Sequence, residues 1–316
     1  MVAYTLRLPR EDAVPRTPNQ YAACLIAFLA LLAGAASAQQ VLSGTEELDF
    51  DRPEAWGMKY FTSVALLTSM GTPDDLEPGA IEVAMEGGWI PSLSTTERRI
   101  GFNGIKVEDL NKTSVFGRPR VNIGLPKRYV LTLSYIPPIE VSGVEPHLFS
   151  AAIARSVWRS ETWRLGLRLY AQRGTVKGDF TCDADTVAAG ADRVRNPFNC
   201  TAVSNDKATQ NYLGLELNAT RKTSGRWEPY FGLAINRLDM EFQVNAEYSG
   251  FIDNNLQRAD GFTWSTTAGV SITTAERWRL VGEVFYSPLD VVRPPSTSSS
   301  NDALLNVRGM IAYRIR

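Results

Sequence analysis

The chain has 316 residues, of which 44% are hydrophobic and 21% are charged, a composition typical of folded proteins and unlike that of disordered ones. Its 33 basic and 34 acidic residues give a formal charge of -1, so no net basic field favours nucleic-acid binding. One histidine and three cysteines are too few soft ligands for a typical zinc or iron–sulfur site. We therefore expect no nucleic-acid partner, no metal site and no cofactor.

An uncharged stretch at 21–38 near the start of the chain is strongly apolar from 25 to 32. Arginines precede it and it ends in Ala36-Ser37-Ala38, the pattern of a secretory signal peptide that is cleaved before Gln39. A permanent membrane anchor is the alternative, but the apolar core is short for a span of about 20 residues. The sequence therefore predicts that residues 1–38 are a signal peptide with an extended first part and that the mature protein is exported.

Two cysteines, Cys182 and Cys200, follow the predicted cleavage site and lie 18 positions apart. Because an exported chain enters an oxidising compartment, this pair is expected to form a disulfide. The surrounding segment 178–207 is rich in Asp, Asn and other turn-forming residues. The sequence predicts one long loop there, closed by the disulfide.

Apolar and polar residues alternate along most of the mature chain. Between 262 and 273 the even positions include Phe262, Trp264, Val270 and Ile272, whereas the odd positions are Thr, Ser and Gly. The same period recurs at 163–170, 213–220, 277–287 and 304–315. A strand places alternate side chains on opposite faces, so these segments are predicted to be strands with one apolar and one polar face.

Strand length and the pattern of connections distinguish a membrane barrel from a soluble sheet. Predicted strands of ten or more residues exceed the usual five or six. The predicted short links lie at 160–161, 223–225 and 275–276, and the long ones at 178–207, 247–260 and 288–302. Short turns at one rim and long loops at the other are characteristic of transmembrane β-barrels.

With these features, residues 57–316 resemble the bacterial outer-membrane β-barrel proteins, as the stretch Arg226-Trp227-Glu228-Pro229-Tyr230-Phe231-Gly232-Leu233 illustrates. The resemblance implies an all-β fold, a closed antiparallel up-and-down transmembrane barrel in the bacterial outer membrane. It also implies contact with outer-membrane lipid and insertion by the barrel-assembly machinery. We expect a monomer, with residues 39–56 as an N-terminal periplasmic segment and 178–207 as an extracellular loop.

We predict about twelve strands, within a range of ten to fourteen. They are placed near 57–69, 80–90, 98–106, 116–125, 128–136, 146–158, 162–177, 208–222, 226–246, 261–274, 277–287 and 303–315. If the residues around Leu110 instead form an irregular segment at the rim or in the lumen, the number of strands falls to ten.

Charged residues fall on the faces that the barrel is expected to turn inward. The candidate lumen-lining residues are Glu82, Glu86, Arg118, Arg120, Arg164, Arg168, Glu216, Glu228, Arg277, Arg279, Glu283 and Arg308. Because both signs are present, two interpretations stay open. The residues form a salt-bridge network that stabilises the barrel, or they provide a selectivity surface for a small solute.

The favoured function is passive passage of a small solute through a channel or transporter. A non-conducting structural or surface-interaction barrel is the main alternative, ahead of a soluble secreted β protein and a barrel enzyme. A hydrolase is disfavoured because His147, the one histidine, and Ser150 are three residues apart on a strand and so face opposite sides. We therefore predict no enzyme and no catalytic residue.

Prolines in two neighbouring segments suggest a particular kind of transporter. Gly124-Leu125-Pro126-Lys127-Arg128-Tyr129, followed by Tyr135-Ile136-Pro137-Pro138, is similar to the long-chain fatty-acid channel family. The resemblance implies kinked strands and hydrophobic solutes that leave sideways. The simpler interpretation is that the prolines mark two turns, because proline breaks strand ladders.

Overall fold

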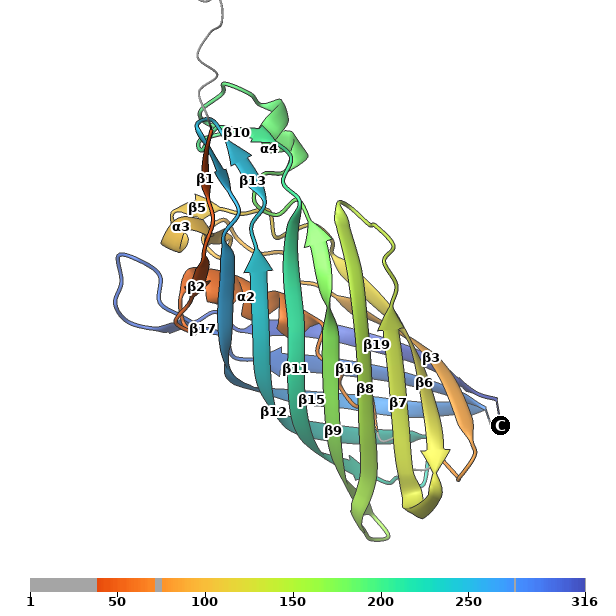
Figure 1. Ribbon diagram of the computed structural model, residues 1–316. Helices are drawn as coiled ribbons and strands as arrows, with labels where there is room; N and C mark the ends of the chain where they lie inside the picture. The colour runs from red at the N-terminus through yellow and green to blue at the C-terminus, as the bar shows by residue number, and fades with distance from the viewer. Residues whose placement is uncertain (1–38, 72–75, 276, 316) are drawn as a thin grey trace, which may run out of the picture. The chain divides into compact units, whose positions relative to one another are not determined.

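The computed structural model describes residues 39–71, 76–275 and 277–315 (Figure 1). The predicted signal peptide, residues 1–38, lies outside the described residues. Among the described residues, no helix is long and apolar enough to cross a membrane.

Ten long antiparallel strands form a closed ring in which every strand pairs with two neighbours. Neighbours in the ring are also neighbours in the chain, and the ring closes where the last strand pairs with the first, with Gly309 opposite Gly87. The predicted closed up-and-down barrel is therefore confirmed. Its strands are β3 (Ile81–Trp89), β6 (Val115–Leu125), β7 (Tyr129–Ile136), β8 (Val144–Arg159), β9 (Trp163–Gly178), β11 (Asp206–Arg221), β12 (Trp227–Gln243), β15 (Leu256–Ala275), β16 (Trp278–Ser287) and β19 (Leu304–Arg314).

Side chains of these strands alternate between the lumen and the outer surface. On β12, Phe231 and Ile235 are each 52% exposed, whereas Tyr230 is 5% exposed and Asn236 is fully buried. The same alternation places apolar side chains outward on β9, β11, β15, β16 and β19. An apolar outer face with a polar interior is favourable in hydrocarbon and unfavourable in water, which is the arrangement that the sequence predicts for a membrane barrel.

The connections differ at the two ends of the barrel. At one end, which we call the short-turn rim, β6 joins β7 through the 3-10 helix η1 (Pro126–Arg128), and β8 joins β9 through 160–162. At the other end, the long-loop rim, the connections are longer and carry secondary structure. They hold β4 (Arg99–Ile100), α3 (Gly101–Gly104), β5 (Lys106–Val107), β17 (Asp290–Val291) and β18 (Ser300–Asn301).

A second, four-stranded sheet extends beyond the long-loop rim (Figure 1). It has the order β1 (Gln40–Leu42), β14 (Phe251–Asp253), β13 (Ala246–Tyr248), β10 (Cys200–Ala202). The predicted loop 178–207 supplies β10 and the short helix α4 (Ala184–Ala188), and Cys182 and Cys200 form the expected disulfide with their Cα atoms 5.8 Å apart. The loop is thus folded against the rim.

Two of the twelve predicted strands are wrong. Residues 57–69 lie in the helix α2 (Pro53–Val64) and in the segment after it, and residues 98–106 form the small β4–α3–β5 turn at the rim. Pro53 at the start of the helix and Glu54 in its first turn are helix-start residues, because proline needs no amide partner there and a carboxylate favours the positive end of the helix dipole. The barrel therefore has ten strands, the lower number that the sequence allows.

The N-terminal segment lies at the long-loop rim. β1 pairs in parallel with β14, and β2 (Thr45–Glu47) pairs in parallel with Leu256–Arg258 of β15. Segment 39–56 is thus at the same end of the barrel as loop 178–207. The predicted periplasmic location of the first and the predicted extracellular location of the second exclude one another.

Candidate functional site

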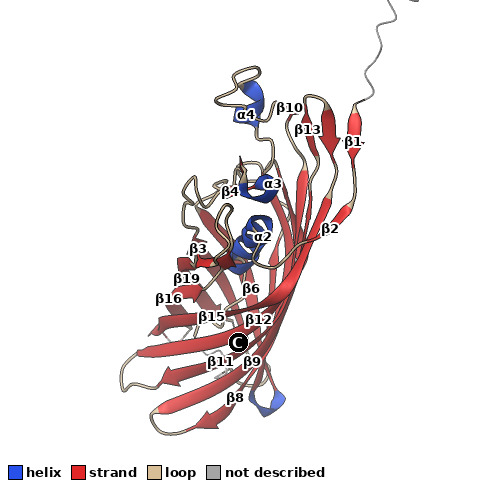
Figure 2. Cartoon of the chain, turned by 90° about the vertical axis from the view of Figure 1, so that its left-hand side faces the viewer, coloured by secondary structure: helices blue, strands red, loops and turns tan. Residues whose placement is uncertain are grey.

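The lumen contains a part of the chain itself. Helix α2 lies on the inner side of the barrel strands (Figure 2), and the chain continues after it as segment 65–71, which has no regular secondary structure. Every residue from Thr62 to Gly71 is buried. We call residues 53–71 the plug.

Five inward-facing arginines bind the main chain of the plug. Arg118 donates to the carbonyls of Ala65 and Leu66 (2.8 and 2.9 Å), Arg120 to Thr68 (2.8 Å), Arg168 to Leu67 (2.7 Å), Arg279 to Met70 (2.9 Å) and Arg308 to Leu66 (2.7 Å). These carbonyls lie after the last helical residue, Val64, in a segment outside any helix or strand ladder. Buried carbonyls need a donor, and the arginines supply it. Arg308 also donates to the Ser63 and Val64 carbonyls of the last helical turn.

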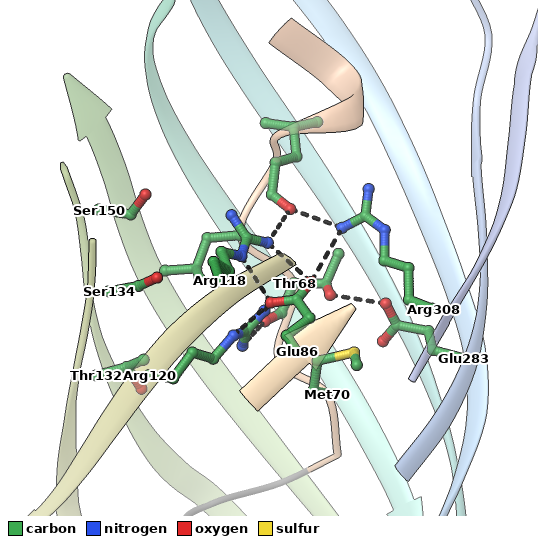
Figure 3. A network of polar contacts seen from close by, with 12 residues as sticks. Thr68, Met70, Glu86, Arg118, Arg120, Thr132, Ser134, Ser150, Glu283 and Arg308 are labelled. Carbon is green, nitrogen blue, oxygen red and sulfur yellow. Dashed lines mark hydrogen bonds and ion pairs between the residues drawn. The ribbon is translucent and has the colours of Figure 1, made fainter. Parts of the chain in front are cut away.

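Glutamates of the wall pair with the same arginines (Figure 3). Glu86 accepts from Nε of Arg118 at 2.6 Å and from Nε of Arg120 at 2.5 Å, and Thr68 of the plug donates to Glu283 at 2.7 Å. Glu82, on the same strand as Glu86, pairs with Arg279 of β16 (2.6 Å), and Glu216 of β11 pairs with Arg168 of β9 (2.8 Å). These contacts join the inward-facing charges of the wall and the plug into one network.

The structure places the twelve candidate lumen-lining residues in three groups. Buried in the lumen are Glu82, Glu86, Arg118, Arg120, Arg164, Arg168, Glu216, Glu283 and Arg308. Two more are half-buried there: Arg279, and Glu228, which pairs with Arg164 at 3.1 Å. Arg277 precedes β16 at the short-turn rim and is exposed.

Tyr212 and Gln210 of β11 also face the lumen and were not among the candidates. The Tyr212 hydroxyl accepts from the Leu67 amide at 2.8 Å and donates to the Ala65 carbonyl at 3.2 Å. Both residues have the same parity as Glu216, so extending the alternation toward the start of β11 would have found them. The partners of Tyr212 in the plug have no such signal, because the plug has no period of two.

The barrel wall is not hydrogen-bonded along its whole height. Pairing of β6 with β7 ends at Arg120 opposite Ser134, although β6 continues upward to Val115 with only β3 as partner. Pairing of β7 with β8 ends at Ile136 opposite Leu148. Residues 145–147 of β8 then pair with β9 alone, and Val144 also bridges to Val141 of the connecting segment. Two strand edges thus face a gap that residues 137–143 bridge, and we call this the wall gap.

Prolines explain why the ladder stops there. Pro137 and Pro138 directly follow β7, while Pro119 and Pro146 lie on the facing parts of β6 and β8. Proline has no N–H to donate to a ladder, so it is found at strand ends and unpaired edges. The proline segments noted in the sequence therefore mark two turns, as the simpler interpretation has it, and the second turn lies in the wall gap.

An apolar cavity of about 500 Å³ lies between the plug and the wall gap. On the plug side it is lined by Phe61, Val64 and Ala65. On the wall side it is lined by Ile90, Leu110, Val115, Phe116, Ile136, Pro137, Ile139, Val141, Val144, Leu148 and Val176, with Lys112, Thr113 and Gln210 among the polar residues. Val115, Ile139 and Val141 line the cavity and are also more than half exposed, so apolar side chains run from the cavity to the outside of the barrel at the gap.

A smaller cavity of about 230 Å³ lies at the long-loop rim, between α2 and the rim turns. It shares Phe61, Leu110 and Gln210 with the apolar cavity. Acidic residues Glu54 and Glu108 line it, and burial raises the pKa of Glu108 to about 7 although Lys106 beside it opposes this shift. We call it the mouth cavity.

His147 and Ser150 lie on opposite sides of the wall, as the sequence predicts. His147 is exposed and packs edge-on against Tyr135, with ring centroids 5.7 Å apart. The buried Ser150 hydroxyl donates to the Gln172 side chain at 2.9 Å. The two residues therefore form no catalytic pair.

In comparisons with known proteins, this chain is similar to other proteins only in architecture. No protein-family model matches the chain, and no curated protein matches it. Similar solved structures include the COG4313 outer membrane channel from Pseudomonas putida F1, at 9% identity and a TM-score of 0.42 over 78% of this chain and 98% of that one. The outer membrane protease OmpT from Escherichia coli has 8% identity and a TM-score of 0.36, over 75% of this chain and 92% of that one.

The Pseudomonas putida toluene transporter TodX is also similar, at 11% identity and a TM-score of 0.31 over 78% of this chain and 70% of that one. At this level of likeness, the closed strand ring and the outward apolar faces of the chain itself decide its class. The chain has the architecture of an outer-membrane β-barrel. It is assigned to no specific family.

Proposed function

We propose that the protein is a passive transporter in the bacterial outer membrane, which passes a small apolar solute between the barrel interior and the lipid through the wall gap. The observation that carries this proposal is the position of the apolar cavity, which lies against the plug on one side and against the gap on the other. An apolar solute loses contact with water when it enters such a cavity, which is favourable in proportion to the area buried.

The plug argues against a wide aqueous pore. Five arginines and Tyr212 bind its main chain, and all of residues 62–71 are buried. An ion entering the apolar cavity would leave its water without gaining a partner charge, which is strongly unfavourable. A transporter of apolar solutes is consistent with both the bound plug and the apolar lining of the cavity, because its solute needs no water-filled path.

The orientation follows from the rims. Long loops of transmembrane barrels face the outside of the cell, and short turns face the periplasm. With this orientation, the disulfide loop 178–207 and the segment 39–56 are both extracellular, and the mouth cavity opens outward. The proposal keeps a cleaved signal peptide at residues 1–38, a monomeric barrel surrounded by outer-membrane lipid, and insertion by the barrel-assembly machinery.

Solute transfer in proteoliposomes tests the proposal. We expect the reconstituted protein to speed the entry of the apolar dye N-phenyl-1-naphthylamine into vesicles and to show no stepwise currents in planar bilayers. Val141→Asp places a charge in the gap, and we expect it to slow dye entry about tenfold. The matched control is Val194→Asp in the rim loop, where Val194 is 90% exposed.

Unchanged heat-modified electrophoretic mobility of Val141→Asp would show that its barrel is folded. Dye entry at the same rate in vesicles with and without the protein would contradict the proposal, as would large single-channel currents.

The folded long-loop rim favours a surface-interaction barrel as a second candidate. The four-stranded sheet, α4 and the disulfide make an ordered surface beyond the barrel, which transport through the wall does not require. The two functions differ in the same assay, because a surface-interaction barrel without transport leaves dye entry unchanged.

A further inference from the structure

Gln210 occupies the boundary between the two cavities. It lies on the inward face of β11, is 4% exposed, and lines both the apolar cavity and the mouth cavity together with Phe61 and Leu110. A solute that moves from the mouth cavity to the wall gap therefore passes its side chain.

The Gln210 side chain has an acceptor without a protein partner. Its Oε1 atom is buried, and no donor of the described residues bonds to it. The main-chain carbonyl of the same residue is used, because it accepts from Gln172 Nε2 at 3.2 Å. A buried acceptor without a donor costs free energy, so the site favours a ligand that brings a donor.

The other polar side chains of the apolar cavity are engaged. Lys112 pairs with Asp109 at 2.6 Å and with Asp179 at 2.7 Å, and the Thr113 hydroxyl donates to the Val115 carbonyl at 2.8 Å. Gln210 thus offers a hydrogen-bonding group to a molecule whose remaining contacts are apolar.

We propose that the apolar cavity binds an apolar molecule with a single neutral hydroxyl group. Gln210 Oε1 accepts a hydrogen bond from this hydroxyl, and this bond determines which apolar molecules the cavity prefers. This inference rests on the proposed transport of an apolar solute and specifies the class of that solute.

A neutral head group fits better than an ionised one. A carboxylate would be repelled by Glu54 and Glu108 of the mouth cavity, and it has no hydrogen to donate to Gln210 Oε1. A cation in the apolar cavity would lack a partner charge, because no carboxylate of the described residues lines the cavity and the two partners of its lining residue Lys112, Asp109 and Asp179, are already paired. A hydroxyl donates one hydrogen bond and carries no charge, and a volume of about 500 Å³ is within the range of small-molecule sites.

Two probes that differ in one group test the inference. 4-Ethylphenol and 4-ethyltoluene have nearly the same shape, and only the first has a hydroxyl. Their binding is measured by displacement of N-phenyl-1-naphthylamine from the protein in lipid nanodiscs, with protein-free nanodiscs as background. We expect 4-ethylphenol to bind about tenfold more tightly than 4-ethyltoluene.

In Gln210→Leu this preference should fall to about one, while 4-ethyltoluene binds as in the natural protein. The matched control is Gln257→Leu, which removes an amide that lines the mouth cavity and not the apolar cavity, and which should keep the tenfold preference.

An unchanged preference in Gln210→Leu overturns the inference. Equal binding of both probes by the natural protein also overturns it, but leaves transport of apolar solutes standing if dye entry into proteoliposomes is still accelerated. Failure of the proposed function has a different signature, since neither probe then displaces the dye and dye entry is not accelerated.

Discussion

Most buried arginines of this barrel bind both main-chain carbonyls and carboxylates, whereas Arg308 acts mainly on carbonyls. Arg308 donates to the carbonyls of Leu66, Val64 and Ser63 and stacks on the Phe285 ring, while its distance to the nearest Glu86 oxygen is 4.0 Å. A charged donor to a buried carbonyl makes a strong hydrogen bond, and its loss leaves the carbonyl unsatisfied. The plug is therefore held largely by charge-assisted bonds to its backbone.

Arg308→Leu tests this at the level of one residue. We expect the free energy of unfolding to fall by about 3 kcal/mol or more, because carbonyls and carboxylates in the interior lose a buried partner. Arg237→Leu is the matched control, since Arg237 is 61% exposed in an ion pair with an equally exposed Asp260, and such pairs contribute about 0–1 kcal/mol. Urea unfolding in lipid vesicles measures both, and equal losses would contradict the role assigned to Arg308.

At the same scale, the sequence shows which residues face inward but not what they bind. The parity of Glu86, Arg118 and Arg308 follows from alternation alone. Their partners do not, because the Leu66 carbonyl lies 242 residues from Arg308 and no local pattern links them. Salt bridges could be anticipated from the mixed charges, whereas binding of arginines to a plug could not.

At the scale of elements, the ten ring strands could be predicted because each is long and buries one face. The plug could not, because its apolar residues are buried on all sides and so lose the one-faced pattern that separates helix from strand. Only end signals such as Pro53 remained. The four prolines near the wall gap indicate in the sequence that strand pairing is interrupted. They do not show where the gap lies, because that depends on which strands become neighbours.

The disulfide loop is an element whose stability can be tested separately from the barrel. Joint substitution of Cys182→Ser and Cys200→Ser removes a cross-link that closes 18 positions of sequence, worth about 3 kcal/mol in the loop-entropy model. We expect trypsin to cleave at Arg193 or Arg195, which are exposed, about a hundredfold faster than in the natural protein. The barrel should keep its heat-modified mobility, and equal cleavage rates would show that the loop is held by packing alone.

At the scale of the whole molecule, the aromatic residues mark the levels at which the barrel meets the membrane surfaces. Near the short-turn rim, exposed tryptophans lie at the ends of four strands, namely Trp158, Trp163, Trp227 and Trp278. Trp278 packs against Tyr313, with ring centroids 4.8 Å apart. Aromatic girdles of this kind flank the apolar band of transmembrane barrels, so these tryptophans mark the edge of the band at the short-turn rim.

Fluorescence quenching tests this placement in one measurement. A variant that keeps only Trp163, which is 43% exposed, should be quenched by nitroxide-labelled lipids and little affected by iodide in the water. A variant that keeps only Trp56, which is 1% exposed inside the lumen, is the matched control and should respond to neither. If iodide quenched the Trp163 variant and labelled lipid did not, the apolar faces would lie in water, and the ring of strands would be a soluble barrel instead of a membrane one. The two variants share the same fold, so the comparison separates a tryptophan on the outer face of a strand from one enclosed in the lumen. Whether that outer face meets lipid or water is the property that separates the two kinds of barrel.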